Sequence, residues 1–131
     1  MSIVVLHEKE FELMIPKNEI KEGIKKMAEQ INADYEGKEL VVVGVLDGVF
    51  MVLAALMKKI TVNVSLELVK LKSYEGQSST GNVKKLLGLT SSLEGKNVLV
   101  VEDIIDTGHT LSYILDLVNS HQPATVETAT L

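Results

Sequence analysis

The stretch from Val98 to Leu111 constrains the fold of this chain more than any other part. Four consecutive apolar residues, Val98–Val101, are followed at once by two acids, Glu102 and Asp103. A short apolar run with such boundaries is typical of a buried parallel strand. Polar and small residues come next, and a helical pattern follows them. The stretch therefore predicts a buried strand, a short polar loop and the start of a helix.

The loop after this strand has the chemistry of a phosphate-binding site. The residues at the expected helix start are Thr107, Gly108, His109 and Thr110. Backbone N–H groups at a helix N-terminus lack partners within the helix, and the helix dipole favours an anion there. We therefore predict that these four residues bind a phosphate group, mainly through their backbone.

Three acids precede that helix. Glu102 and Asp103 follow the carboxyl end of the predicted strand, which is where open α/β sheets bind ligands. Adjacent carboxylates suit the hydroxyls of a sugar, or a hard cation such as Mg²⁺ held partly through water. Asp106 is placed to act as a general base or to cap the helix. In the alternative, Glu102 and Asp103 are solvated strand-end residues and Asp106 is only an N-cap. The Thr-Gly-His-Thr sequence directly after these acids disfavours that alternative.

The segment VVEDIIDTGHTL, residues 100–111, resembles the ribose-phosphate signature of the type I phosphoribosyltransferases. Its EDIIDTG-x-T form is most similar to the hypoxanthine–guanine branch of that family. The resemblance implies a hypoxanthine–guanine phosphoribosyltransferase of purine salvage. Such an enzyme transfers ribosyl 5-phosphate from phosphoribosyl pyrophosphate to a purine base, with Mg²⁺, and releases pyrophosphate.

The resemblance also implies a role for each residue of the segment. Glu102 and Asp103 would hold the ribose hydroxyls and, mostly indirectly, Mg²⁺. Asp106 would accept the proton from purine N7 as the catalytic base. The phosphate-binding loop would run from Asp106 to Thr110, and it would bind the 5-phosphate through the backbone of residues 107–109 and the hydroxyls of Thr107 and Thr110.

The turn Leu46-Asp47-Gly48 follows a nearly continuous apolar run at residues 40–46, which predicts a central strand. It resembles the pyrophosphate loop of the family. The hypoxanthine–guanine branch more often has a lysine or a neutral residue at the position of Asp47. An acid beside pyrophosphate is unfavourable unless Mg²⁺ or a lysine offsets it.

The segment KLKSYEG, residues 70–76, resembles the mobile catalytic loop of the family. Ser73 and Tyr74 match the pair that closes over the bound diphosphate. Lys70 stands where the branch tends to have arginine, so a point charge replaces a bidentate fork. The polar residues 75–88 are too many for an idle connection, and we expect a long functional loop there.

The rest of the chain alternates strands and helices. Apolar or alternating runs predict further strands at residues 3–6, 62–71, with a possible bulge near Leu68, and 125–131. Helical periodicity predicts helices from Asn18 to about residue 31, from 49 to 59, and after the signature. We therefore expect an α/β fold with a doubly wound, mostly parallel sheet and flanking helices, in one domain over residues 1–131.

The composition narrows the classes of partner. The 131 residues carry a net charge of −5 without a basic stripe, which argues against nucleic acid as a partner. No apolar stretch approaches the roughly 20 residues of a membrane span, and the N-terminus does not resemble a signal peptide. The chain has no cysteine, which is compatible with a cytoplasmic protein. All 13 basic residues are lysine, which is expected of an engineered sequence or of a low-GC genome.

The resemblance extends over nearly the whole chain and stops at Leu131, whereas family members continue for several dozen residues that bind the purine. We therefore expect a truncated or engineered core without the purine-binding part, so base specificity and enzymatic activity are left open. The alternative function is a non-catalytic module that binds a nucleotide 5-phosphate or phosphoribosyl pyrophosphate. The family commonly forms dimers or tetramers, so a homodimer or tetramer is expected. A response-regulator receiver is disfavoured, because receivers place their acid pair after the first strand.

Overall fold

The computed structural model describes residues 3–73 and 83–131 of the chain. Its centre is a five-stranded sheet with the strand order β5-β4-β3-β6-β7, and a separate two-stranded sheet pairs β1 with β2. In chain order the elements are β1 (Ile3–Leu6), β2 (Lys9–Glu12), α1 (Lys17–Asp34), β3 (Glu39–Leu46), α2 (Phe50–Met57), β4 (Asn63–Ser73), β5 (Val83–Leu87), β6 (Asn97–Glu102), α3 (His109–Asn119) and β7 (Thr125–Thr130).

The sheet is mostly parallel, as the sequence predicts. Strand β3 pairs in parallel with both β4 and β6, and β6 pairs in parallel with β7. Strand β5 is antiparallel to β4 at one edge. Strands β3 and β6 are buried along nearly their whole length, which explains their continuous apolar sequences.

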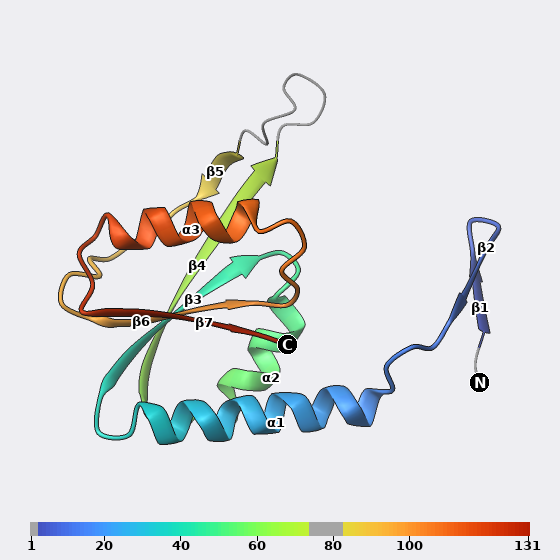
Figure 1. The fold of residues 1–131 in the computed structure, drawn as a ribbon, viewed down its shortest axis with the longest axis horizontal. Coiled ribbons are helices and arrows are strands. Elements are labelled where there is room, and N and C mark those ends of the chain that lie inside the picture. Colours follow the sequence, from blue (N-terminus) through green and yellow to red (C-terminus); the bar gives the residue numbers. More distant parts are fainter. Residues whose placement is uncertain (1–2, 74–82) are drawn as a thin grey trace.

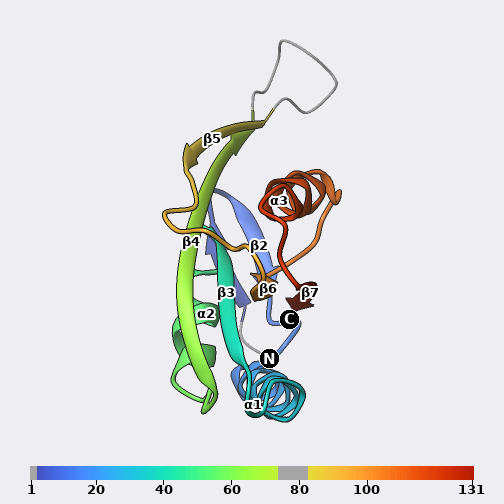
Figure 2. The same ribbon diagram turned by 90° about the vertical axis from the view of Figure 1, so that its left-hand side faces the viewer.

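Helices cover both faces of this sheet, which confirms the doubly wound arrangement. Helices α1 and α2 lie below the sheet in Figure 1 and α3 lies above it, and Figure 2 shows α3 and α2 on opposite sides of the twisted strands. Alternate residues of β3 point to the two faces, so that Val42 packs with α1 and α2 while Val43 packs with α3. A Cβ added to Gly44 would lie 2.6 Å from Leu53 Cδ2, so glycine allows α2 to lie close against β3.

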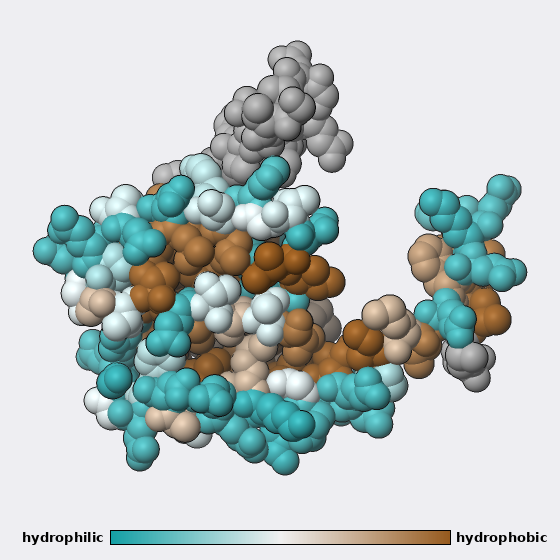
Figure 3. All heavy atoms as spheres, viewed as in Figure 1, coloured by the Kyte–Doolittle hydropathy of each residue, from teal (hydrophilic) through white to brown (hydrophobic). Residues whose placement is uncertain are grey.

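The N-terminal strands form a hairpin that stands away from the sheet (Figure 1). Residues 3–6 are a strand, as predicted, but they are not part of the main sheet. Figure 3 shows apolar side chains on the hairpin and on the linker that follows it. Val5, Phe11 and Met14 are among these exposed residues. In the described structure the hairpin therefore covers neither face of the sheet.

Three local predictions differ from the structure. The expected long loop over residues 75–88 contains strand β5, because its apolar and lysine residues pair with the end of β4. The irregularity in β4 falls between Lys70 and Leu71 rather than near Leu68. Helix α1 begins at Lys17 after Pro16, and within the described part of the chain no side chain caps it, so Asn18 is not the cap. No helix among the described residues is both long and apolar enough to span a membrane.

Candidate functional site

The candidate site lies at the carboxyl ends of β3 and β6, where the order in which strands are added to the sheet reverses. After β3 the chain continues to β4 on one side, and it later returns to place β6 on the other side of β3. Ligands of open α/β sheets bind at such a switch point, outside the carboxyl ends of the strands. A pocket of about 490 Å³ occupies this position. The residues that line it are Val45, Leu46, Gly48, Glu102, Asp103, Ile104, Ile105, Asp106, Thr107, Gly108, Thr110 and Leu111.

The two adjacent acids of this pocket differ in their contact with water. Glu102 is the last residue of β6 and is only 6% exposed. Burial, with the negative charge of Asp103, raises the pKa of the Glu102 carboxyl above its usual value. Asp103 is half-buried, and its backbone carbonyl accepts a hydrogen bond of 3.2 Å from the Thr130 hydroxyl at the end of β7. The site thus holds one buried and one partly solvated carboxylate.

Gly48 and Asp103 are in close contact across the pocket. A Cβ added to Gly48 would lie 2.7 Å from Asp103 Oδ2, which is shorter than any normal contact. The absence of a side chain at residue 48 therefore makes room for the Asp103 carboxylate. The turn after β3 and the acids at the end of β6 consequently form one site, although 53 residues lie between Gly48 and Glu102 in the sequence.

The loop before α3 leads the chain into the helix through a glycine. Gly108 precedes the first helical residue and has a φ of +85°, a conformation that glycine adopts without strain. The His109 N–H donates a hydrogen bond of 3.3 Å to Thr107 Oγ1. Asp106 is exposed and makes no capping bond within the described part of the chain, so the interpretation of Asp106 as a helix cap is wrong. Its carboxylate is therefore available to a ligand.

Asp47 and Lys70 form an ion pair at the edge of this site. Lys70 stands opposite Leu46 in the parallel pairing of β3 with β4, which places its side chain beside the next residue, Asp47. The distance from Lys70 Nζ to Asp47 Oδ2 is 3.1 Å. A lysine therefore offsets the acid in the turn, which meets one of the two conditions under which an acid could stand beside pyrophosphate.

The remaining predicted residues lie at the end of β4. Ser73 is the last residue of that strand, and Tyr74 falls outside the described residues. The prediction that this pair closes over a diphosphate stays a prediction. Strand β4 does bring Lys70 to the carboxyl edge of the sheet, where the other site residues gather.

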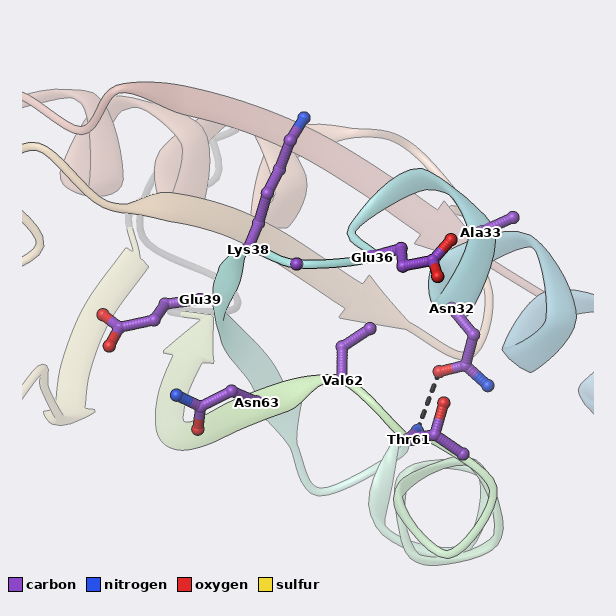
Figure 4. Close-up of a pocket in the computed structure, with 9 residues that line it drawn as sticks. Asn32, Ala33, Glu36, Lys38, Glu39, Thr61, Val62 and Asn63 are labelled. Atoms are coloured by element: carbon purple, nitrogen blue, oxygen red, sulfur yellow. Dashed lines mark hydrogen bonds between the residues drawn. The ribbon is translucent and has the colours of Figure 1, made fainter.

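A larger pocket lies at the opposite end of the parallel strands, beside their amino ends. It has a volume of about 720 Å³ and is lined by residues at the amino ends of β3 and β4 and at the end of α1 (Figure 4). Asn32 accepts a 2.8 Å hydrogen bond from the Thr61 N–H and donates one of 3.0 Å to the Lys59 carbonyl. These bonds tie α1 to the connection between α2 and β4. We assign this pocket a structural origin, because ligands bind at the carboxyl edge of such sheets.

Sequence reasoning found the acids and the helix start, and it missed two contacts. The first is the approach of Asp103 to Gly48, and the second is the pairing of Lys70 with Asp47. Both contacts join residues after different strands, so they depend on strand order and register. The sequence carries one signal for the second contact, because an acid and a lysine stand in the two segments that resemble the pyrophosphate loop and the mobile loop.

Comparison with known proteins identifies the family. The phosphoribosyl transferase domain family matches residues 16–131, which include every residue of the candidate site. The chain belongs to the phosphoribosyltransferase family. The chain is 39% identical over 125 residues to the hypoxanthine-guanine phosphoribosyltransferase of Dictyostelium discoideum. The match covers 92% of this chain and 69% of the relative.

Solved structures of the same family have the same fold. A hypoxanthine-guanine phosphoribosyltransferase of Bacillus anthracis, with a HEPES molecule in its active site, is 38% identical, with a TM-score of 0.86 over 92% of this chain and 72% of that one. A hypoxanthine phosphoribosyltransferase of Staphylococcus aureus is also 38% identical, with a TM-score of 0.85 over 92% of this chain and 66% of that one. The chain thus spans about two thirds of the length of these relatives.

Proposed function

We propose that this chain is a hypoxanthine/guanine phosphoribosyltransferase of purine salvage. It would transfer the ribosyl 5-phosphate of phosphoribosyl pyrophosphate to a purine base and release pyrophosphate. The observation that carries this proposal is the pocket at the switch point. It unites the turn after β3, the acids after β6 and the start of α3 around one volume of ligand size. The names of the relatives agree with this substrate class.

The proposal gives each part of the pocket one task. The start of α3, at Gly108–Thr110, binds the 5-phosphate through backbone N–H groups and the helix dipole. Glu102 and Asp103 accept hydrogen bonds from the ribose hydroxyls between that phosphate and the turn at Gly48. The turn at residues 46–48 receives the pyrophosphate. Asp106, exposed in the loop, accepts the proton that the purine nitrogen loses when it bonds to the ribose carbon.

The proposed cofactor is Mg²⁺. Among the described residues, no group of three or more histidines or acids is placed to hold a metal ion by itself. Glu102 and Asp103 are a fit for partial coordination, because two adjacent carboxylates of which one is buried are relieved by a cation. When bound together with substrate, Mg²⁺ neutralises the charge of the leaving pyrophosphate. The two carboxylates would contact the ion mainly through water or the substrate hydroxyls.

A second candidate function is a module that binds a nucleotide 5-phosphate or phosphoribosyl pyrophosphate without turnover. One observation favours it, since the exposed acid Asp47 stands in the turn that would receive the pyrophosphate. The two candidates share the phosphate and ribose site and differ in whether Asp106 takes part in chemistry. We also propose that residues 1–131 are one phosphoribosyltransferase core domain, and that the chain assembles as a homodimer or tetramer, which sedimentation would test.

The experiment that separates these functions compares wild type with Asp106→Asn. The assay follows formation of inosine monophosphate from hypoxanthine, phosphoribosyl pyrophosphate and Mg²⁺. The enzyme proposal predicts that Asp106→Asn lowers turnover by about 10²- to 10⁴-fold, the usual contribution of a general base. The affinity for inosine monophosphate should change little, because the phosphate site is intact.

Asp116→Asn is the matched control, because Asp116 is an exposed acid on the body of α3. It should leave turnover unchanged. A folded wild-type protein that binds inosine monophosphate and shows no turnover would support the non-catalytic module. A protein that neither binds the nucleotide nor turns over would contradict both functions.

A further inference from the structure

The Asp47–Lys70 ion pair introduces two opposite charges where the proposed pyrophosphate turn meets the solvent. Asp47 is 75% exposed and Lys70 is 41% exposed, so neither charge is buried. Their neighbours Leu46 and Gly48 line the pocket at the switch point. Asp47 and Lys70 do not line the pocket themselves, so they would act on an anion at this turn from beside it.

The two side chains act on an arriving anion in opposite directions. The Asp47 carboxylate repels a diphosphate, and water screens that repulsion only in part at contact distance. The Lys70 ammonium attracts the diphosphate and sits on a long, flexible stem with three donors. Exposed ion pairs of this kind contribute little to stability, so Lys70 can exchange Asp47 for a phosphate oxygen at small cost.

We propose that the Asp47–Lys70 pair sets the affinity of the turn for the diphosphate group and makes it sensitive to the charge of that group. This inference rests on the proposed function, because it assumes that residues 46–48 receive the pyrophosphate. Asp47 opposes the fully charged diphosphate and holds Lys70 when the turn is empty. Lys70 transfers to the diphosphate when the ligand binds. Mg²⁺ lowers the charge of the ligand and thereby weakens the opposition from Asp47.

The register of the sheet makes this pairing specific. Leu46 and Lys70 are partners in the parallel ladder, so the Lys70 stem begins one residue away from Asp47 on the neighbouring strand. The contact therefore does not depend on a flexible loop. The acid in the turn and the lysine on β4 match each other across the sheet and leave the turn without a net side-chain charge.

The test measures the binding of inorganic pyrophosphate by calorimetry, with and without Mg²⁺. Asp47→Asn should tighten metal-free pyrophosphate by about fivefold, because the repulsion is lost and Lys70 is released. The gain should be smaller with Mg²⁺. Lys70→Met should weaken binding, and it should weaken it more in the Asp47→Asn background, where Lys70 is no longer shared with the carboxylate.

Glu29→Gln is the matched control, since Glu29 is an exposed acid on α1 away from the site, and it should not change the affinity. Unchanged or weaker pyrophosphate binding by Asp47→Asn would overturn the inference. Inosine monophosphate binding by the same proteins distinguishes failure of the ion-pair inference from failure of the proposed function. If wild type binds the nucleotide and Asp47→Asn has no effect on pyrophosphate, this inference alone fails. If wild type binds neither ligand, the proposed function fails with it.

Discussion

Glu102 carries the clearest conflict between stability and binding among the site residues. Its carboxylate is buried beside the negative charge of Asp103, and burial raises its pKa. A buried acid in this state is costly to ionise, and a sugar hydroxyl or a cation would relieve the cost. Strained or poorly solvated groups of this kind are common at binding sites, where the ligand completes their surroundings.

Glu102→Gln should therefore stabilise the empty protein at neutral pH by about 1 kcal/mol and weaken the binding of phosphoribosyl pyrophosphate by about tenfold. The folded pKa is raised, so the favourable contribution of Glu102 is present at low pH and is lost as the pH rises through that pKa. In thermal unfolding, the melting temperature of the variant should thus exceed that of wild type at pH 7, and the difference should disappear near about pH 4. A variant that is less stable than wild type at pH 7 would contradict this account.

Gly48 shows how one residue can be required by a contact rather than by backbone conformation. Gly48→Ala should displace the Asp103 carboxylate, because the new Cβ would lie 2.7 Å from Oδ2. The displaced group is the end of a half-buried side chain, so stability should fall by less than about 1 kcal/mol. The affinity for phosphoribosyl pyrophosphate should fall by about tenfold or more. Calorimetry with chemical denaturation separates the two effects, and equal affinity of variant and wild type would exclude the contact as a determinant of binding.

At the scale of the elements, strand β4 supports the connection between β5 and β6 through a buried acid. Glu67 is 6% exposed and accepts hydrogen bonds from Thr90 and Ser91, in each case from both the backbone N–H and the hydroxyl. Burial alone would raise the pKa of Glu67, but the hydrogen bonds from Ser91 and Thr90 together lower it. The ionised form of Glu67 therefore fastens residues 90–91 to the sheet.

Glu67→Gln should cost about 2 kcal/mol at pH 7, because its amide nitrogen would face donors in place of a carboxylate oxygen. The folded pKa is lowered, so the stabilisation by Glu67 is present above the unfolded pKa and is lost as the pH falls through the folded value. Urea unfolding should show a difference at pH 7 that shrinks below about pH 4. Glu29→Gln, an exposed substitution, should show no such difference, and a pH-independent loss in Glu67→Gln would point to packing alone.

Much of the element structure could be predicted from local sequence. Strands β3 and β6 are continuous apolar runs, which predicts that both of their faces are buried. The helical periodicity after the acids predicts the start of α3. Strand β5 was missed because its five residues, VKKLL, show neither a continuous apolar run nor a period-two alternation. The burial of Glu67 was also missed, because no local pattern in the sequence predicts that Thr90 and Ser91 donate hydrogen bonds to its carboxylate.

At the scale of the whole molecule, a pocket lies at each end of the parallel strands. The larger one, near Asn32 and Thr61, is held by hydrogen bonds between elements, and the smaller one holds the acids and the helix start. Pocket volume alone would favour the pocket at the amino ends. Strand order favours the pocket at the carboxyl ends, because the switch point lies between β3 and β6. The sequence predicted the residues of this site, whereas their meeting around one pocket required the order of the strands.

The measurement that tests the central claim most directly is titration of the ¹⁵N-labelled protein with inosine monophosphate. The account predicts that the backbone amide signals of Thr107, Gly108, His109 and Thr110 shift most, because these groups would surround the 5-phosphate. The amides of Asn32 and Thr61, in the larger pocket, should not move. Shifts confined to that larger pocket, or no saturable shift in a folded protein, would contradict the assignment of the phosphate site to the start of α3.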